Sequence, residues 1–475
     1  MRSHVFSASV FSLLCISVGG KGVENNGNDN EQQCVNGGTP VNSSYCQCPA
    51  YVGGRFCETV KCQRWGIPDK DRCACAPGWY DKYCGIRGCR PPNEDNLDHS
   101  KRSIILVVNM KTSMKEQIEA LRNSFKQMIG EITKSWNTGN NTENWIENYI
   151  VYGFVQDNQN AKQTQLVADN ADDVISFLGN MTLYKGDDAQ PVLNAVKTAQ
   201  QLFPQMKSHS VVLVFTDSPA SDATPWSHRF EDRNNEQLCL QISFLWRSKI
   251  SFILSFPSGI DTDKDGVDVY KRLSLSTHGD YFHVNSSAET EDILKNVIST
   301  YFFPENVAVG FDQNEDVVVV PTVDQVGDWI LTLLTKDAST ADSLPEVAGA
   351  ILLAQGTNYK LFAAKFMAII SISNSKGKFN FRTFLQSKNT ILFDYNSDMA
   401  IDVGNGIVHL GVTMHSTIRT FGFPQFNNMT YRVMQNGKKV REEYVAFRRP
   451  QEDCTFEWAF QPWVNTNDCP PGPIT

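Results

Sequence analysis

The chain has 475 residues, of which 41% are hydrophobic and 20% are charged, and its formal net charge is −9. This length is too great for one ordinary domain and indicates about three. Binding of nucleic acid needs Lys and Arg clustered on one face, and the acidic balance offers no such surplus. We therefore set nucleic acid aside as a partner.

The first twenty residues are typical of a secretory signal peptide. Arg2 and His4 precede an apolar stretch from Val5 to Val18, and Gly19 and Gly20 follow as small residues for cleavage. Residues 21–33 are polar and aperiodic, which predicts a disordered leader. No later run reaches the roughly 18 apolar residues that a membrane helix needs. We expect a secreted, extracellular protein without a membrane span.

Cysteines and glycosylation motifs fit the same compartment. Of the 13 cysteines, Cys15 leaves with the signal segment, and the even number that remains predicts a disulfide framework. Motifs that accept N-linked glycans begin at Asn42, Asn140, Asn180, Asn285 and Asn428.

Two short segments repeat one cysteine pattern. The first, "CVNGGTPVNSSYCQCPAYVGGRFC", has the spacing C-x11-C-x-C-x8-C, and the second, "CQRWGIPDKDRCACAPGWYDKYC", has C-x10-C-x-C-x8-C. Both resemble epidermal growth factor (EGF) modules in which one of three disulfides is missing, with Pro40 at the position of the third cysteine. Segments this short bury too little surface to fold without cross-links. The resemblance implies EGF-like modules at residues 34–60 and 61–89, with the pairs Cys34–Cys46, Cys48–Cys57, Cys62–Cys73 and Cys75–Cys84.

Residues 103–302 alternate between strand and helix patterns. Strand candidates include "SIILVV", "NYIVYGFV", "TQLVA", "SVVLVFTD", "ISFILSFP" and "DYFHV". The clearest helix follows Met114, and a later one opens with Ser286 and Glu289 at the spacing of a capping box. This alternation predicts an α/β domain with a mostly parallel, doubly wound sheet.

Two loops of this domain are candidates for a ligand site. Ligands of open α/β sheets bind at the carboxyl ends of the strands, and "VVNMKTSM" and "VFTDSPAS" follow two of them. The element order resembles the von Willebrand factor A domain of hemicentin-type proteins, in which Mg²⁺ is held by Asp-x-Ser-x-Ser, a Thr and a later Asp. Carried over one by one, these positions are Asn109, Lys111, Ser113, Asp187 or Asp188, and Asp217.

These substitutions predict a degenerate metal site and no cofactor. Asn109 removes a negative charge, and Lys111 brings an ammonium group toward the ion's position, where two charges roughly 4 Å apart repel by about 4 kcal/mol at an effective dielectric of about 20. Our first hypothesis is that the ammonium replaces the ion and neutralises Asp217 and Asp187 or Asp188. The alternatives are a residual, weak divalent-ion site and an exposed Lys111 without a partner.

The rest of the chain is β-rich. Short apolar runs such as "DWILTLLT" and "KFMAIISI", separated by Gly, Asn and Asp, predict an all-β sandwich over residues 305–450, with a hairpin at Asn436-Gly437. Residues 451–475 form a tail that a Cys454–Cys469 disulfide would close. Cys89 and Cys239 then remain, and either they pair with each other or Cys239 is a buried thiol.

One further string resembles a metal-binding motif. In "DTDKDGVD", Asp261, Asp263 and Asp265 match the start of a calcium-binding EF-hand loop, but the twelfth position is Arg272 where the motif has Glu. A solvated acidic loop is our first interpretation, and a weak calcium site is the alternative.

No catalytic motif is recognisable in the sequence. It has no H-E-x-x-H, G-x-S-x-G, P-loop or G-x-G-x-x-G pattern, and its histidines, including His209, His228, His278 and His283, lack metal-ligand spacing. We therefore expect a protein that is not an enzyme.

The sequence as a whole predicts a multidomain adhesion or recognition protein. It would bind an extracellular protein or glycan without a functional metal-ion-dependent adhesion site. The domain assembly also resembles secreted nematode proteins that combine EGF and von Willebrand A domains, some of them linked to innate immunity. A soluble innate-immune or signalling factor and a structural component of the extracellular matrix are therefore the alternatives.

Overall fold

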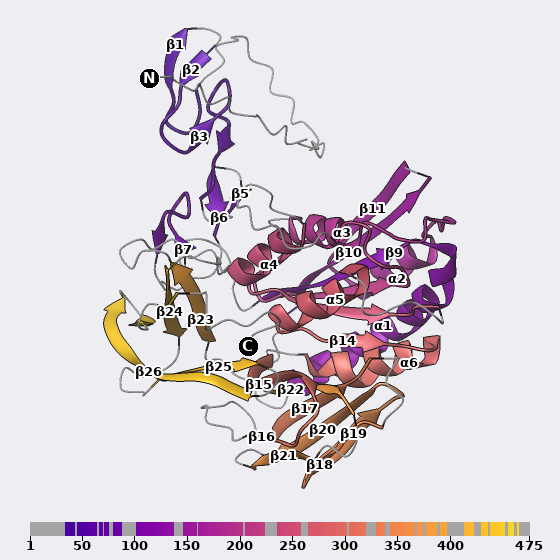
Figure 1. Cartoon of the computed structure of the whole chain (residues 1–475). Helices are drawn as coiled ribbons and strands as arrows, with labels where there is room; N and C mark the ends of the chain where they lie inside the picture. The colour runs from indigo at the N-terminus through magenta and orange to yellow at the C-terminus, as the bar shows by residue number, and fades with distance from the viewer. Residues whose placement is uncertain are drawn as a thin grey trace, which may run out of the picture. The chain divides into compact units, whose positions relative to one another are not determined.

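The computed structural model divides the chain into two compact units, Met1–Glu58 and Thr59–Thr475, which we describe separately (Figure 1). The residues whose structure is described are 34–42, 45–63, 66–69, 71–75, 79–87, 101–136, 146–158, 160–202, 205–223, 235–257, 265–301, 304–319, 329–337, 343–365, 368–373, 377–386, 390–396, 413–421, 429–435, 438–451, 455–459 and 463–464. No helix within these ranges is long and apolar enough to cross a membrane.

The second unit contains a six-stranded sheet with the order β11-β10-β9-β12-β13-β14. Five of its strands are parallel to one another, and the edge strand β11 is antiparallel to its neighbour β10. The two central strands are buried along their whole length, which explains their continuous apolar sequences. The strand bounds are β9 (Arg102–Asn109), β10 (Ile146–Asp157), β11 (Asn160–Ala168), β12 (Val211–Thr216), β13 (Lys249–Leu254) and β14 (Tyr281–His283).

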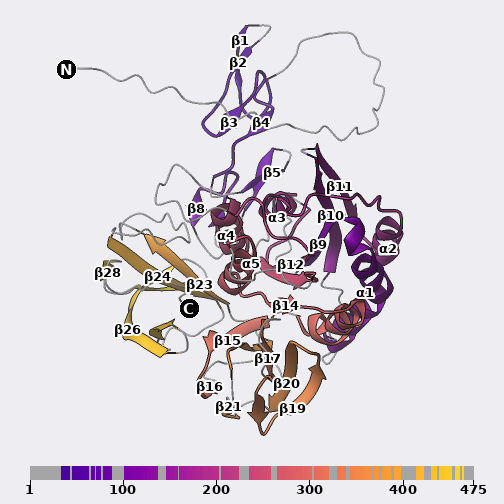
Figure 2. The ribbon, with the colours of Figure 1, turned by 45° about the vertical axis from the view of Figure 1, so that its right-hand side comes forward.

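Helices cover both faces of this sheet (Figure 2). Successive side chains of β9 point to opposite faces: Leu106 belongs to a core with residues of α1, α2, η2 and η3, whereas Ile105 and Val107 belong to a core with residues of α3, α4 and α5. The helix bounds are η1 (Thr112–Met114), α1 (Lys115–Trp136), α2 (Ala171–Gly179), α3 (Val192–Gln200), α4 (Asn235–Trp246), α5 (Asp265–Ser276) and α6 (Ser287–Asp292), which continues as η2 (Ile293–Val297) and η3 (Ile298–Thr300).

The predicted capping box lies at the start of α6. Ser286 accepts a hydrogen bond from the backbone N–H of Glu289 at 3.3 Å, as the motif requires. The carboxylate of Glu289 in turn accepts from the N–H of Asn285 at 2.7 Å, one residue earlier than in the usual box. Both bonds fix the position at which the last helix of the α/β domain begins.

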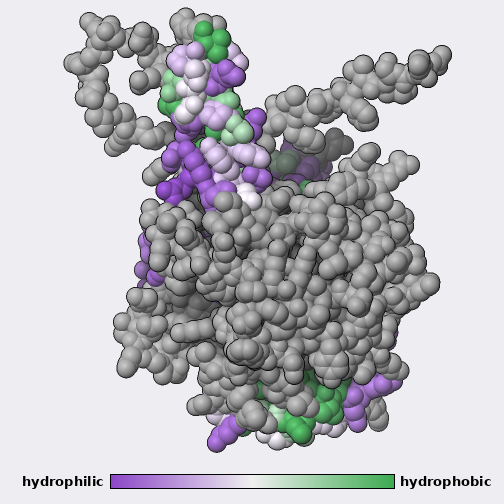
Figure 3. Space-filling view, turned by 90° about the vertical axis from the view of Figure 1, so that its left-hand side faces the viewer, coloured by the Kyte–Doolittle hydropathy of each residue, from purple (hydrophilic) through white to green (hydrophobic). Residues whose placement is uncertain are grey.

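Residues 304–386 form two antiparallel sheets. The five-stranded sheet has the order β15-β22-β17-β20-β19, and the three-stranded sheet has the order β16-β21-β18. Hydrophobic residues reach the surface in this region, at the lower end of the molecule in Figure 3. The strand bounds are β15 (Pro304–Gln313), β16 (Val317–Val319), β17 (Trp329–Thr335), β18 (Glu346–Ala348), β19 (Ile351–Gln355), β20 (Tyr359–Lys365), β21 (Ile370–Ser373) and β22 (Phe379–Gln386).

β17, the central strand of the five-stranded sheet, is buried on both faces along most of its length. Leu333 of β17 joins the core that also contains residues of α1, η2 and η3, whereas Ile330 and Leu334 join a core shared with the three-stranded sheet. An ion pair crosses to the α/β domain, because Arg382 donates from Nε to Oδ1 of Asp280 at 2.9 Å, and Asp280 also accepts from the hydroxyl of Tyr301. Apolar packing and a buried ion pair therefore join this sheet to the α/β domain.

The described strands between residues 390 and 464 form another sheet, with the order β23-β24-β27-β26-β25 and β28 paired to β24. The hairpin predicted at Asn436-Gly437 corresponds to β25 and β26, which pair with Gln435 opposite Lys438. The tail predicted over residues 451–475 contributes β27 and β28 to this sheet, while Cys454 and Cys469 lie outside the described residues. Strand bounds are β23 (Thr390–Asn396), β24 (Thr413–Phe421), β25 (Met429–Gln435), β26 (Lys438–Gln451), β27 (Thr455–Ala459) and β28 (Trp463–Val464).

The cysteine-rich segments consist of very short strands held by disulfides. Their strands are β1 (Thr39–Asn42), β2 (Tyr45–Gln47), β3 (Val52–Gly53), β4 (Thr59–Val60), β5 (Ile67–Asp69), β6 (Arg72–Ala74), β7 (Trp79–Tyr80) and β8 (Ile86–Arg87). The disulfides are the four pairs that the EGF resemblance implies: Cys34–Cys46, Cys48–Cys57, Cys62–Cys73 and Cys75–Cys84.

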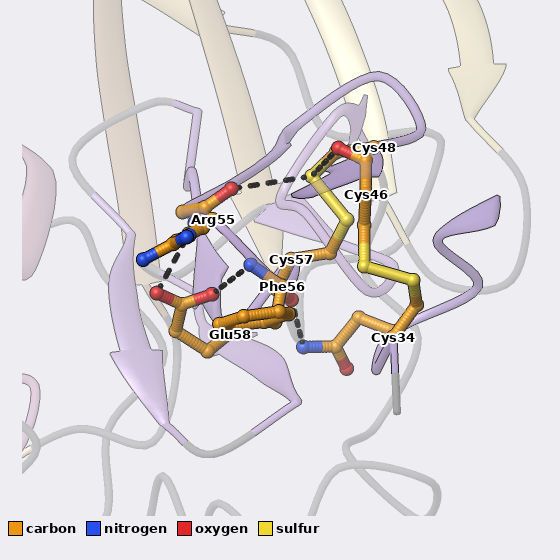
Figure 4. Close-up of a disulfide and its surroundings, with 9 residues drawn as sticks. Cys34, Cys46, Cys48, Arg55, Phe56, Cys57 and Glu58 are labelled. Carbon is orange, nitrogen blue, oxygen red and sulfur yellow. Dashed lines mark hydrogen bonds between the residues drawn. A yellow bond between two sulfur atoms is a disulfide. The ribbon is translucent and has the colours of Figure 1, made fainter. Parts of the chain in front are cut away.

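A carboxylate closes the turn at the end of the first cysteine-rich segment (Figure 4). Glu58 accepts hydrogen bonds from the backbone N–H groups of Phe56 at 2.7 Å and Arg55 at 3.3 Å. Hydrogen bonds from its own backbone N–H and from that of Phe56 lower the pKa of Glu58. Gly54 permits the turn, because its φ of +95° is unfavourable for other residues and a Cβ there would meet the Glu58 carboxylate.

Candidate functional site

The candidate site lies at the carboxyl edge of the six-stranded sheet, where β9 and β12 end side by side. The two strands are parallel neighbours, with Val108 opposite Phe215. Asn109 therefore ends its strand next to Thr216, and the residues that follow both strands share one loop cluster. The strand order thus brings together side chains that are more than a hundred residues apart in the sequence.

Asn109 is a hydrogen-bond donor at the centre of this cluster. Its side chain is fully buried, and its amide nitrogen lies 3.2 Å from Oγ1 of Thr216 and 3.3 Å from both Oδ1 of Asp217 and Oγ of Ser218. A carboxylate at this position would instead repel Asp217. The amide therefore stabilises an arrangement in which Asp217 is the acidic group at the end of β12.

Lys111 brings a positive charge to the same place. Its Nζ donates to Oγ of Ser218 at 3.0 Å and lies 3.7 Å from Oδ1 of Asp217. Ser218 in turn donates from its hydroxyl to Oδ1 of Asp217 at 2.7 Å. Only 13% of the Lys111 side chain and 7% of the Asp217 side chain are exposed, which excludes the interpretation of Lys111 as a solvated lysine without a partner. We call Asn109, Lys111, Asp217 and Ser218 the closed cluster.

The backbone around Lys111 fixes its direction. Thr112 donates its N–H to the carbonyl of Tyr184 at 2.7 Å, and Tyr184 donates to the carbonyl of Met110 at 2.9 Å. Gly186 makes room for the lysine stem, because a Cβ on this residue would lie 2.6 Å from Cγ of Lys111. Gly186 also has a φ of +69°, which glycine adopts without strain.

The other predicted site residues are not part of the closed cluster. The carboxylate of Asp187 accepts from the backbone N–H of Asn158 at 3.1 Å, so it closes the turn between β10 and β11. Asp188 is exposed, and Ser113 is exposed within η1. The prediction that Asp187 or Asp188 joins Lys111 was therefore wrong. The carboxylate of Asp187 accepts a hydrogen bond within a local turn, and Asp188 is exposed to solvent.

Three further residues were missed by sequence reasoning. The hydroxyl of Ser218 forms hydrogen bonds with Asn109, Lys111 and Asp217. The only indication of this role in the sequence was its position directly after Asp217. Gln190 is fully buried and holds the loop before α3 against β10. Its side chain accepts from the backbone N–H of Gln156 at 2.7 Å and donates to the carbonyl of Gln156 at 3.0 Å. Tyr270 donates its hydroxyl to the carbonyl of Ser218 at 2.8 Å, and burial raises the pKa of this tyrosine well above its ordinary value.

The residues of the closed cluster do not fit a divalent metal ion. An ammonium group has no lone pair to offer, and the nitrogen of Asn109 that faces Asp217 is a donor as well. Mg²⁺ needs oxygen ligands in near-octahedral arrangement, and here the hydroxyl of Ser218 and one carboxylate are already engaged in hydrogen bonds. Within the described ranges, no group of three His, Cys, Asp or Glu side chains could hold a metal ion.

The acidic string near α5 does not provide a complete site in the described residues. Asp261 and Asp263 lie outside the described ranges, and Asp265 is the first residue of α5. Arg272, at the twelfth position of the EF-hand pattern, pairs with Glu236, its Nε lying 3.0 Å from Oε1. An arginine that is already held by an ion pair takes the place of the bidentate carboxylate.

Cys239 is a buried free thiol in this structure, which corresponds to the second of the two alternatives left open for it, a disulfide with Cys89 or a buried thiol. The α4 helix turns its side chain toward α3, where Sγ lies 3.4 Å from the carbonyl of Leu193. Burial is the main cause that raises the pKa of the Cys239 thiol, which keeps it protonated and unreactive. Cys89 lies outside the described residues.

The remaining candidates are placed as follows. His283 is buried against the hydroxyl of Tyr281, and its pKa is lowered to about 4, chiefly by burial. Asn180 and Asn285 are exposed, as a glycan acceptor must be. His209 is partly buried and His278 exposed. The positions of Asn140, His228 and Asn428 and the side chain of Asn42 lie outside the described part of the chain.

Comparison with solved structures finds several similar chains of low identity. One is a von Willebrand factor type A protein from Catenulispora acidiphila, with 8% identity over 72% of this chain and 65% of that one and a TM-score of 0.33. Others are proximal thread matrix protein 1 from the mussel byssus, with a zinc-occupied MIDAS motif (13% identity, 45% and 50% coverage, TM-score 0.30), and the pilus adhesin SpaC from Lactobacillus rhamnosus GG (11% identity, 68% and 42% coverage, TM-score 0.31). This chain thus spans 65% or less of each, and with such TM-scores we base no inference on them.

The comparison with family models is more specific. No curated protein matches the chain. Residues 103–286, however, match the family model described as von Willebrand factor A domain, over the part of the chain that forms the six-stranded sheet and its first five helices. The segment at residues 103–286 is therefore a von Willebrand factor A domain.

Proposed function

We propose that the protein is a secreted, non-enzymatic recognition or adhesion protein whose von Willebrand A domain binds an extracellular protein or glycan without a metal ion. The observation that carries this proposal is the position of Lys111, whose Nζ lies 3.0 Å from Ser218 and 3.7 Å from Asp217. A tethered cation at this point balances the charge of Asp217. The domain then has no open metal position through which a partner's carboxylate could bind.

The partner would therefore bind by ordinary surface complementarity at the same edge of the sheet. Exposed polar residues lie in the loops next to the closed cluster: Thr112 and Ser113 follow Lys111, and Asp188 belongs to the loop whose Tyr184 pairs with Lys111. Hydrogen bonds from such side chains select a partner by position, and each contributes modestly to affinity. This arrangement favours binding over catalysis, because no nucleophile stands beside a free base within the closed cluster.

The cysteine-rich segments support the extracellular part of this proposal. Their four disulfides are of the kind that persist in oxidising compartments. We infer that residues 34–60 and 61–89 are two shortened EGF-like modules that act as spacers or contact sites, and that exposed Asn180 and Asn285 accept glycans.

Affinity capture from the extracellular fluid tests the proposal. The intact protein is used as bait in the presence of either Mg²⁺ or a chelator, and captured proteins and glycans are identified by mass spectrometry. We expect the same partner in equal yield under both conditions. A partner that is captured only with Mg²⁺ and is lost with Asp217→Ala would contradict metal-independent recognition.

Two charge-reversal variants locate the binding edge. Asp188→Arg alters an exposed residue beside the closed cluster, whereas Asp169→Arg makes the same change after β11, whose antiparallel direction places it at the opposite edge of the sheet. We expect Asp188→Arg to reduce capture and Asp169→Arg to leave it unchanged. The captured partner also separates the alternatives: a matrix protein favours a structural role, and a receptor or microbial surface favours an immune or signalling role.

A further inference from the structure

One edge strand of the described sheets lacks the protection that edges usually have. The edge of a sheet exposes unpaired backbone groups, and natural monomers protect it with charged residues, proline or a very short strand. In the described sheets of three or more strands, the edge strands of at least five residues are β11, β15, β19, β23 and β25. Four of these contain protective residues, namely Lys162, Pro304 with Glu305, Asp394 and Arg432. β19, with the sequence ILLAQ, contains none.

The first three side chains of β19 are also exposed and apolar. Ile351 is 57% exposed, Leu352 42% and Leu353 50%. The pairing of β19 with β20 shifts register between Leu352 and Ala354, so that a bulge leaves two consecutive leucines facing solvent. Bulges can shield an edge by twisting it away from partners. Here the bulge adds a leucine to the exposed surface, which a shielding device would not do.

We propose that β19 is a self-association edge, at which a second copy of this chain pairs its own β19 antiparallel about a two-fold axis near Leu353. A two-fold interface must be complementary to itself. The sequence from Gly349 to Tyr359 contains no charged residue, so pairing it with its own copy brings no like charges together. The exposed leucines of one copy would cover those of the other, and the free backbone groups would gain partners.

The expected dimer is weak. A five-residue strand buries much less than the roughly 1,600 Å² of a standard stable interface. Self-association should therefore be reversible and depend on concentration, which would suit a protein that gains avidity by presenting two binding edges together.

Sedimentation analysis of the full-length protein over a hundredfold range of concentration tests the proposal. We expect the average mass to rise toward that of a dimer. Leu353→Lys should abolish this rise, because pairing would place two ammonium groups face to face. Val167→Lys is the matched control, since Val167 is 41% exposed on β11, the edge of another sheet, and this variant should behave as the unaltered protein. A protein that stays monomeric throughout, or dimerises equally after Leu353→Lys, overturns the proposal.

Cross-linking provides a second test that does not require the charged variant to fold. Opposite residues of an antiparallel pair have Cα atoms about 4.5–5.5 Å apart, a separation that a disulfide can bridge. Leu353→Cys should form disulfide-linked dimers under mild oxidation, whereas Val167→Cys should not. Equal yields of dimer from the two variants would refute pairing at β19.

Discussion

At the scale of single residues, the closed cluster shows how one lysine can balance the charge of a nearly buried carboxylate. Lys111 has a fixed direction because Gly186 leaves space for the methylene groups of its side chain. Its ammonium group donates to the hydroxyl of Ser218, and that hydroxyl donates to the carboxylate of Asp217. Asn109 adds a donor where the family pattern has an acid. The charge of Asp217 is thus balanced within the chain, and each of these residues depends on the others.

The stability of the closed cluster is testable by substitution of its lysine. Lys111→Met leaves the nearly buried Asp217 without its cation and should lower the free energy of unfolding by about 1–3 kcal/mol, measured by urea denaturation. Lys111→Met combined with Asp217→Asn should cost less than Lys111→Met alone, because the unpaired charge is then absent.

Lys126 provides the control for this comparison. It pairs with Asp172 at 3.0 Å, but both side chains are about two-thirds or more exposed, and such pairs contribute roughly 0–1 kcal/mol. If Lys111→Met is no more costly than Lys126→Met, the lysine does not take the structural role of the ion.

At the scale of elements, the five-stranded sheet differs most from what its sequence indicates. The run "WILTLLT" in β17 was recognisable as a strand, but its apolar residues cover both faces of the sheet. Periodicity distinguishes a half-buried strand from a fully buried one, yet it does not reveal what lies on either face. The ion pair between Asp280 and Arg382 was equally hidden, because the two residues are 102 positions apart.

Breaking this ion pair should strongly destabilise the contact between the α/β domain and the sheet, because it would leave one buried charge without a partner. Asp280 and Arg382 are 5% and 3% exposed, and Arg382 also lies over the ring of Phe384 at 3.9 Å. Arg382→Met removes the partner of a buried carboxylate and should cost about 3–5 kcal/mol in thermal or urea unfolding.

Glu346→Gln offers a contrast in the neighbouring sheet. Glu346 pairs with Lys360 but is 73% exposed, so its loss should cost below about 1 kcal/mol. If Arg382→Met and Glu346→Gln lowered the free energy of unfolding equally, solvent or another group would have to stabilise the charge of Asp280 once Arg382 is removed.

At the scale of the whole molecule, the sequence predicted the α/β domain well because strand and helix patterns alternate over most of it, apart from the neighbouring strands β10 and β11 and the neighbouring helices α2 and α3. The carboxyl edge was also located correctly, since a parallel sheet brings the ends of β9 and β12 together. The detailed partners were less predictable. Whether Asp187 faces Lys111 or closes a turn depends on a few loop torsions that no spacing encodes, and the same holds for Cys239, whose partner depends on the rotation of α4.

Titration of the full-length protein with Mg²⁺ or Mn²⁺ in a calorimeter is the most direct test of the central claim that Lys111 excludes a metal ion. We predict no saturable binding by the unaltered protein, whereas Asn109→Asp combined with Lys111→Ser should restore oxygen ligands and bind the ion, which shows that the method can detect a site. Saturable micromolar binding by the unaltered protein that Asp217→Ala abolishes would contradict the account.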